Sequence, residues 1–341
     1  MASRTMRPSR RYNANKGQPP SRGVSFVGMK LNYLWRSAAA LLASGLFRAL
    51  PIGAASALGG WMGRVIGPRL SRHGIARANL ELALPELSPE DMDRIMVGMW
   101  NNLGRTVSEI AHLGTFSRAE ESDNGLITFA GLEHLERLKQ DYRGAIFVGG
   151  HLGNWEVAPL MLRRAGLETV SVYRPFNEPY IDRLARQQRI KVNPNWAIKR
   201  QDVKALVSAL RDRRSVSMLV DQKLWQGELI PFFGHDAHTT TLPAKLALRY
   251  GVPIVPFRVE RLSGARIRVS AYPPITLPEG TSDTGDEEAE IALTLAINRV
   301  LEGWIRERPE QWNWLHRRWR IKKKYANKRL SSKRPAPGMH P

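Results

Sequence analysis

Ala145-Ile-Phe-Val-Gly-Gly-His151-Leu-Gly-Asn-Trp-Glu156 is the stretch of this sequence from which a fold can first be inferred. Residues 145–148 form a short apolar run that leads into two glycines, which is typical of a buried β-strand. His151 lies just past the carboxyl end of that strand, and Glu156 lies where a helix is expected to begin. Because sites in parallel sheets lie beyond the carboxyl ends of the strands, the stretch also predicts the place of a functional site.

Strand and helix patterns alternate along the rest of the chain. Further strands are expected at residues 169–173, 215–220, 252–259 and 266–270, and helices at residues 131–140, 157–165, 179–190, 203–211, 242–250 and 287–307. Residues 67–113 have a helical pattern, in which Ser88-Pro89-Glu90-Asp91 is a helix start with a capping serine and a first-turn proline. The alternation predicts the α/β class, with a mostly parallel sheet flanked by helices and an N-terminal membrane-associated helix.

The chain is expected to have four parts. These are a disordered basic arm at residues 1–30, a membrane-anchoring helical segment at residues 31–66, a catalytic domain at residues 67–321 and a basic flexible tail at residues 322–341. The anchoring segment holds two weakly apolar runs, and neither reaches the roughly 20 residues of a membrane span. Arg48 and Pro51 favour a broken helix there, which either lies in one leaflet or crosses the bilayer.

The composition limits the chemistry. Lys and Arg number 52 against 31 Asp and Glu, a formal net charge of +21, which implies an anionic partner such as nucleic acid, acidic lipid headgroups or an acidic carrier protein. Cysteine is absent, which excludes a thiolate nucleophile and a cysteine zinc site. The serine-hydrolase elbow, the phosphate loop and the dinucleotide fingerprint are also missing from the sequence, and nothing in it indicates a cofactor.

His151 and Glu156 are the candidate catalytic pair. On one continuous helix a separation of five residues would place them about 140° apart, so their contact requires a loop, which Gly149, Gly150 and Gly153 permit. A neutral imidazole can take a proton from a hydroxyl, Glu156 can hold its tautomer, and backbone N–H groups at the helix start can receive an oxyanion. The alternative is that both residues cap a helix, and their spacing alone does not choose between the two.

Polar residues also follow two other expected strands. Asp221 lies at a strand end, where it either organises the site or is a buried aspartate satisfied by loop amides. Arg174 and Asn177 lie on the same rim, where a guanidinium suits an anionic headgroup; a solvated surface arginine is the alternative. His235-Asp236-Ala237-His238 is interpreted as a loop near the cleft rather than as a metal site.

Indole and guanidinium side chains alternate near the carboxyl end. They are Trp304, Trp312, Trp314 and Trp319 with Arg306, Arg308, Arg317, Arg318 and Arg320. Such a segment can stack nucleic-acid bases or anchor a protein at an anionic lipid interface. The apolar runs near the start of the chain favour lipid, and they make nucleic acid the weaker hypothesis.

Several segments together carry a resemblance to a known family. They are Arg77-Ala-Asn-Leu80, Leu84-Pro-Glu-Leu87, Trp100-Asn-Asn-Leu-Gly-Arg105 with Glu109, His151-Leu-Gly-Asn-Trp-Glu156, Tyr173-Arg-Pro-Phe-Asn177, Leu219-Val-Asp-Gln222, Pro231-Phe-Phe-Gly234 and Arg308-Pro-Glu-Gln-Trp-Asn-Trp-Leu-His-Arg-Arg318. In this order the chain resembles the lipid A biosynthesis acyltransferase family, the late Kdo-dependent lauroyl/myristoyl transferases. That family belongs to the wider lysophospholipid acyltransferase group with the H-x(4)-[DE] motif.

The resemblance implies an inner-membrane enzyme on the cytoplasmic face. Its donor would be acyl carrier protein, and its acceptor a hydroxyl of a Kdo-bearing lipid A precursor, reached without an acyl-enzyme. His151 and Glu156 match the catalytic dyad and Asp221 would act with them, while Arg174, Asn177 and Gln222 would bind substrate. Acylation of another glycolipid or a lysophospholipid is the alternative, and the acyl chain length and acceptor position stay open.

Overall fold

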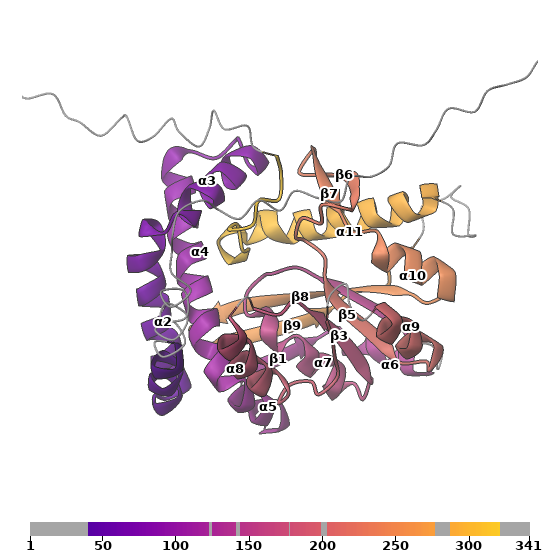
Figure 1. The fold of residues 1–341 in the computed structure, drawn as a ribbon, viewed down its shortest axis with the longest axis horizontal. Coiled ribbons are helices and arrows are strands. Elements are labelled where there is room, and N and C mark those ends of the chain that lie inside the picture. The colour runs from indigo at the N-terminus through magenta and orange to yellow at the C-terminus, as the bar shows by residue number, and fades with distance from the viewer. Residues whose placement is uncertain are drawn as a thin grey trace, which may run out of the picture.

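The computed structural model describes residues 40–122, 125–140, 144–176, 178–198, 203–276 and 287–320. A seven-stranded sheet in the order β1-β9-β8-β2-β5-β3-β4 forms its centre (Figure 1). The strands are β1 (Ile127–Ala130), β2 (Ile146–Gly149), β3 (Thr169–Tyr173), β4 (Trp196–Ile198), β5 (Ser215–Leu219), β8 (Ile254–Ser263) and β9 (Arg266–Ala271). All neighbours are parallel except β8 and β9, so the predicted α/β class and mostly parallel sheet are confirmed.

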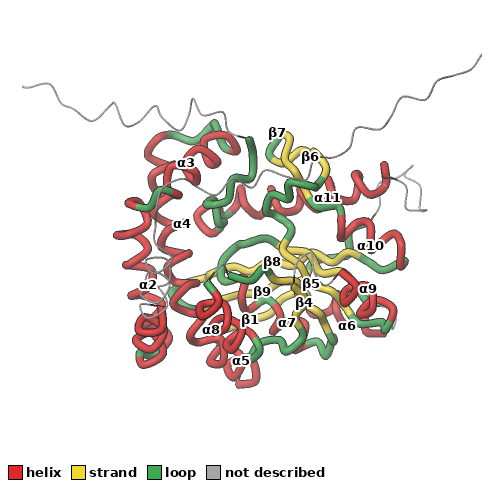
Figure 2. The backbone as a smooth tube through the Cα atoms, in the orientation of Figure 1, coloured by secondary structure: helices red, strands yellow, loops and turns green. Residues whose placement is uncertain are grey.

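Helices cover both faces of the sheet, as the backbone tube in Figure 2 shows. On β2, Ile146 and Val148 pack in one apolar cluster with residues of α9, α10 and α11, whereas Phe147 packs in a second with residues of α5, α6 and α7. This follows from the two-residue period of a strand that is buried on both sides. The helices are α5 (Leu113–Ser122), α6 (Leu132–Gln140), α7 (Pro159–Arg164), α8 (Pro179–Arg189), α9 (Val203–Arg211), α10 (Leu242–Tyr250) and α11 (Glu287–Glu307).

The N-terminal helices stand beside the sheet. A helix at residues 40–49 ends before Pro51, and α2 (Ile52–Ile66) begins directly after it, so the predicted break at this proline is confirmed. The elements η1 (Gly67–Arg69), α3 (Arg72–Ala83) and α4 (Pro89–Glu109) follow. The Ser88 hydroxyl accepts a hydrogen bond of 3.1 Å from the Asp91 N–H, which confirms the predicted helix start.

In the described part of the chain, no helix has the length and apolar character needed to cross a bilayer. The predicted anchoring role of residues 31–66 therefore stays a prediction. The predicted arm at residues 1–30 and tail at residues 322–341 lie outside the described residues.

The helices α2 and α4 touch through their backbones. A Cβ atom added at Gly104 would lie 2.1 Å from the Gly59 carbonyl oxygen, and one added at Gly63 would lie 2.1 Å from the Trp100 carbonyl oxygen. Such distances are possible because glycine has no side chain to hold the two helices apart. The contact seats α2 directly on the helix that supports the site described below.

Substitution of Gly104 by alanine is expected to lower the free energy of unfolding by about 1–3 kcal/mol, because the added methyl group forces the helices apart. Gly303 in α11 is the matched control, since an added Cβ would meet no atom within 4 Å there. Gly303→Ala should be neutral or stabilising by up to about 1 kcal/mol, from helix propensity. Urea unfolding of both variants measures the difference, and equal stabilities would contradict the close contact.

A two-stranded hairpin lies above the main sheet and corrects one prediction. Residues 235–238 were expected to form a loop, but they belong to β7 (His235–Thr239), which pairs with β6 (Glu228–Phe232). Phe233 and Gly234 have positive φ values of 53° and 71° and form the two-residue turn between the strands. The strand was missed because its exposed face is polar, which weakens the apolar alternation on which strand predictions depend.

The tryptophan-rich carboxyl segment corrects a second prediction, that its indoles bind nucleic-acid bases or lipid. Trp304, Trp312, Trp314 and Trp319 are all buried in the apolar core, so neither base stacking nor anchoring in lipid by these indoles is possible. The Trp319 Nε1–H donates to the Phe232 carbonyl oxygen at 3.1 Å, which fixes the segment to the hairpin. The four indoles serve packing, and the arginines between them divide into buried and exposed ones.

Candidate active site

His151 and Asp221 meet at the carboxyl ends of two neighbouring parallel strands. Their strands β2 and β5 are paired, with Gly149 opposite Leu219, so the loops that follow lie side by side. The His151 Nδ1 atom lies 2.7 Å from Asp221 Oδ1, and the His151 backbone N–H donates to Oδ2 at 2.8 Å. The Trp312 Nε1–H donates to the same Oδ2 atom at 2.7 Å, so both carboxylate oxygens are bonded.

The charge state of Asp221 determines the tautomer of His151. Burial raises the pKa of the Asp221 carboxyl, but the charge of His151 and the hydrogen bonds from His151 and Trp312 outweigh it and hold that pKa below its ordinary value. The ionised carboxylate can only accept hydrogen bonds, so Nδ1 of a neutral imidazole carries the hydrogen. The Nε2 atom is then the proton acceptor, and the Gln222 amide donates to it at 3.0 Å.

Glu156 does not hold His151, which corrects the predicted dyad contact. Its buried carboxylate forms a two-pronged ion pair with Arg189 of α8, with Nε 2.6 Å from Oε2 and Nη2 2.5 Å from Oε1. Burial lowers the pKa of the Arg189 guanidinium, but the charge of Glu156 outweighs this and raises it. The Asn154 side chain accepts from the Glu156 N–H at 3.2 Å and begins η3 (Trp155–Val157).

Four of the backbone donors near the expected helix start are occupied. The N–H groups of His151, Leu152, Gly153 and Glu156 bond to Asp221, to the Gly150 carbonyl, to the Gln311 carbonyl and to Asn154 respectively. A tight turn follows the strand before the helix begins, so these donors face the protein. Side chains at the cavity, such as Arg174 and Gln222, are further candidate donors for a developing negative charge.

A buried polar network holds this loop from behind. Asn102 and Thr106 of α4 both donate to the Gly153 carbonyl oxygen, at 3.1 and 3.0 Å. Asn154 donates to Glu109 at 2.8 Å, and Glu109 is itself paired with Arg261 of β8 at 2.6 Å. Gly153 has a φ of 55°, and a Cβ atom there would lie 2.7 Å from the Val259 carbonyl oxygen, so only glycine fits the turn.

His151 opens onto a cavity of about 840 Å³. Its walls are largely apolar and include Leu103 and Val107 of α4, Val203 and Leu206 of α9, Met218 of β5 and Phe257 of β8. A cavity of this size and lining suits hydrocarbon chains. The Trp155 ring packs edge-on against the imidazole, with centroids 5.1 Å apart.

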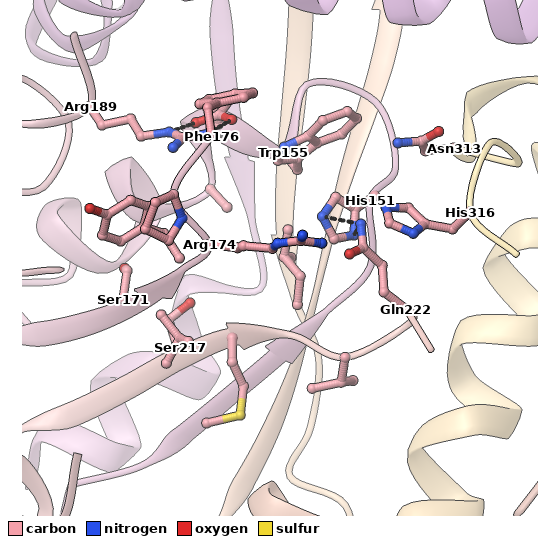
Figure 3. Close-up of a pocket in the computed structure, with 18 of the residues that line it drawn as sticks. His151, Trp155, Ser171, Arg174, Phe176, Arg189, Ser217, Gln222, Asn313 and His316 are labelled. Atoms are coloured by element: carbon pink, nitrogen blue, oxygen red, sulfur yellow. Dashed lines mark hydrogen bonds and ion pairs between the residues drawn. The ribbon is translucent and has the colours of Figure 1, made fainter. Parts of the chain in front are cut away.

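The structure gathers most of the predicted site residues around this cavity. His151, Glu156, Arg174 and Gln222 line it, and Asp221 lies directly behind the imidazole. In Figure 3 the Arg174 side chain extends toward His151, while Gln222 and His316 lie on the other side of the ring. Asn177 lies outside the described residues.

Three residues at the site were missed from the sequence. Trp312 bonds Asp221, Arg189 bonds Glu156, and His316 lines the cavity. Trp312 and His316 belong to the carboxyl segment that carried the family resemblance, which was the available signal. Arg189 is the last residue of a polar helix, and nothing in its local pattern separates it from the other arginines there.

His316 is a neutral group beside the imidazole of His151, with ring centroids 6.4 Å apart. Burial, followed by the charges of His151, Arg72 and Arg174, lowers the pKa of His316 to about 4, against an opposing effect of Asp221. A neutral imidazole at this place can accept or donate a hydrogen bond without adding a positive charge to the site.

Acid is therefore expected to destabilise the protein partly through His316. Between pH 6.5 and about 4 the unfolded chain binds a proton at this residue that the folded chain does not, so stability falls as the pH falls. The difference reaches about 2 kcal/mol near pH 5. Urea unfolding at pH 7 and pH 5 should show a smaller acid loss for His316→Gln than for the wild type; equal losses would contradict a neutral buried His316.

Comparison with known proteins shows the family of the chain. A family model described as bacterial lipid A biosynthesis acyltransferase matches residues 29–321. The lipid A biosynthesis lauroyltransferase of Escherichia coli (strain K12) is 28% identical over 259 residues, which are 74% of this chain and 80% of that protein. The lipid A biosynthesis palmitoleoyltransferase of the same strain is 27% identical over 281 residues, or 78% of this chain and 84% of that protein.

Other matches have names outside lipid A biosynthesis. The phosphatidylinositol mannoside acyltransferase of Mycobacterium tuberculosis (strain ATCC 25618 / H37Rv) is 25% identical over 258 residues, covering 74% of this chain and 77% of that protein. The crystal structure of the 1-acyl-sn-glycerophosphate acyltransferase PlsC from Thermotoga maritima matches 73% of this chain and 99% of that one, with 14% identity and a TM-score of 0.34. The family model spans well over half of the sequence, and the chain therefore belongs to the bacterial lipid A biosynthesis acyltransferase family and is an acyltransferase.

Proposed function

We propose that the protein is a late acyltransferase of lipid A biosynthesis, which transfers a fatty acyl chain from acyl carrier protein to a hydroxyl of a Kdo-bearing lipid A precursor. The observation that supports this most is the His151–Asp221 pair at the opening of a large apolar cavity, in a chain of the lipid A acyltransferase family. The cavity offers room for acyl chains, and the pair offers a base beside them.

The proposed reaction is a direct transfer. The Nε2 atom of His151 takes the proton of the acceptor hydroxyl as its oxygen attacks the thioester carbonyl carbon, and Asp221 stabilises the imidazolium that forms. The tetrahedral intermediate then collapses, the carbon–sulfur bond breaks, and the leaving thiolate takes the proton from Nε2. The acceptor hydroxyl must displace the Gln222 amide from Nε2, after which that amide and Arg174 are the nearby donors for the oxyanion.

In this proposal Glu156 positions the cavity wall, and the remaining predicted residues bind the substrate. Through Arg189, Glu156 fixes the cavity wall next to Trp155, since removal of either partner would leave a buried charge unpaired. Arg174 and Gln222 contact the substrate, and Asn177 is assigned the same role from the sequence alone. No step of this reaction requires a cofactor.

We further propose that the protein works on the cytoplasmic face of the inner membrane. The support is a group of large apolar side chains left exposed on the N-terminal helices: Leu41, Leu42, Leu46, Trp61 and Ile66. Exposed apolar clusters of this kind mark interaction surfaces, and a hydrophobic lipid acceptor requires access from a bilayer.

The test is the mass spectrum of lipid A from cells that lack the protein. Loss of one secondary acyl chain, restored by the wild-type gene but not by His151→Ala, is the expected result. The mass of the lost chain also gives its length. Unchanged lipid A in these cells would overturn the proposed acceptor.

The similarity to a phosphatidylinositol mannoside acyltransferase supports a second candidate, the acylation of another glycolipid. The same catalytic pair would serve it, because the base acts on any suitably placed hydroxyl. Unchanged lipid A together with loss of an acyl chain from a different glycolipid in the total lipid extract would favour this second candidate.

A further inference from the structure

A cluster of cations surrounds one exposed indole beside the cavity. In residues 222–226 the side chains alternate, so that Gln222, Leu224 and Gln226 line the cavity while Lys223 and Trp225 do not. The Trp225 side chain is 63% exposed. The Lys223 Nζ atom lies 3.5 Å from the centre of the Trp225 ring. One side of this short segment therefore belongs to the active site and the other to the surface.

Two further arginines reach the same surface from the carboxyl segment. The buried Arg318 donates to the His238 carbonyl oxygen and to the Thr239 hydroxyl, both at 2.7 Å, which fixes the segment to β7. Its neighbours Arg317 and Arg320 are exposed, and the Arg320 guanidinium carbon lies 5.7 Å from the Trp225 ring centre. We call Lys223, Trp225, His238, Arg317 and Arg320 the Trp225 patch.

The positive charge of the Trp225 patch is not neutralised within the described residues. Arg258 and Arg306 elsewhere each form an ion pair with a carboxylate, but Lys223, Arg317 and Arg320 form none in the part of the chain that the structure describes. Burial, and then the charges of Arg320, Arg318 and Arg317, lower the pKa of Lys223, which shows that these cations repel one another. A group of like charges held together on a fixed scaffold attracts an anionic partner.

We propose that the Trp225 patch docks an acidic face of acyl carrier protein, so that the thioester enters the cavity past Gln222. This rests on the carrier-bound donor of the proposed function. Placement favours a protein over lipid: the apolar group proposed above to meet the membrane lies on helix 40–49 and α2, at the left edge of Figure 1, whereas β6 and β7 stand at its top. The Trp225 ring adds the aromatic contact typical of protein interfaces.

The test compares two donors of the same acyl chain, one bound to acyl carrier protein and one a pantetheine thioester without protein. The patch variant is Lys223→Glu with Arg320→Glu. The control is Arg137→Glu with Lys139→Glu on α6, which makes the same charge change at two exposed sites away from the hairpin. The ratio of kcat/KM for the carrier-bound donor to that for the free thioester should fall at least about tenfold in the patch variant and stay at the wild-type value in the control.

Other outcomes overturn the proposal in distinguishable ways. An unchanged ratio in the patch variant excludes docking there. A loss of binding to phosphatidylglycerol vesicles with an unchanged ratio assigns the patch to lipid. If the wild-type enzyme transfers the acyl chain from the free thioester but not from the carrier-bound one, acyl carrier protein is not the donor. Titration of the wild-type enzyme with holo-acyl carrier protein then shows whether the carrier binds at all. Lack of binding overturns the docking site as well.

Discussion

The His151→Ala variant is expected to lose acyl transfer by about 10⁴-fold or more, because the acceptor hydroxyl is left without a base. A neutral hydroxyl attacks a thioester poorly, and the chain has no cysteine or serine elbow that could replace the imidazole by forming an acyl-enzyme. The measurement is single-turnover transfer from an acyl carrier protein thioester to a lipid A precursor.

The same variant should stay folded, since the buried Asp221 carboxylate keeps its hydrogen bonds from the backbone N–H of residue 151 and from the Trp312 indole N–H. Its urea unfolding midpoint and its binding of the lipid acceptor provide the controls. Normal turnover by a folded His151→Ala protein would refute the assignment of the base.

The Asp221→Asn variant is expected to lose about 10³- to 10⁴-fold in kcat through the tautomer of His151. At Oδ2 the carboxylate accepts two fixed donors, the His151 backbone N–H and the Trp312 indole N–H. The amide of asparagine can place its nitrogen at the Oδ1 position, facing Nδ1, but not against those two donors. Nδ1 would then have to accept, the hydrogen would move to Nε2, and the proton acceptor would be lost.

The Glu156→Gln variant provides the contrast, because the sequence predicted Glu156 as the partner of His151. Its kcat should fall less than that of Asp221→Asn, while its free energy of unfolding should fall by about 3 kcal/mol as Arg189 loses its charge partner. Adding Arg189→Gln should recover part of that stability. A larger loss of kcat in Glu156→Gln than in Asp221→Asn would return the orienting role to Glu156.

Much of the fold could be predicted from the sequence, because β2 is apolar on both faces and helices alternate with strands after it. The helices α9, α10 and α11 begin and end at the predicted residues. The strands β1 and β4 were missed, since each is short and lies at an edge of the sheet, where few apolar contacts shape the sequence. The strand β7 was missed because its polar exposed face hides the apolar alternation of a strand.

The sequence predicted where the site residues lie better than it predicted which side chains bond to one another. Strand ends indicated His151, Arg174 and Asp221, because the rule for parallel sheets depends on local patterns. Which carboxylate meets the imidazole depends on strand order, and the pairing of β2 with β5 cannot be read from residues 70 positions apart. His151 and Glu156 were expected either to form a catalytic pair or to cap a helix, and the structure shows neither arrangement. Asn154 caps the turn, and Glu156 pairs with Arg189.

The close seat of α2 on α4 has a mechanical consequence. The Ser56 hydroxyl of α2 donates to Glu109 at 2.6 Å, and Glu109 in turn accepts from Asn154, the residue before Trp155. Gly59 and Gly104 are in backbone contact, so the outer helix is joined to the catalytic loop by close packing as well as by these hydrogen bonds. A surface bound to the exposed side of α2 would therefore hold His151 at a fixed height and tilt above it.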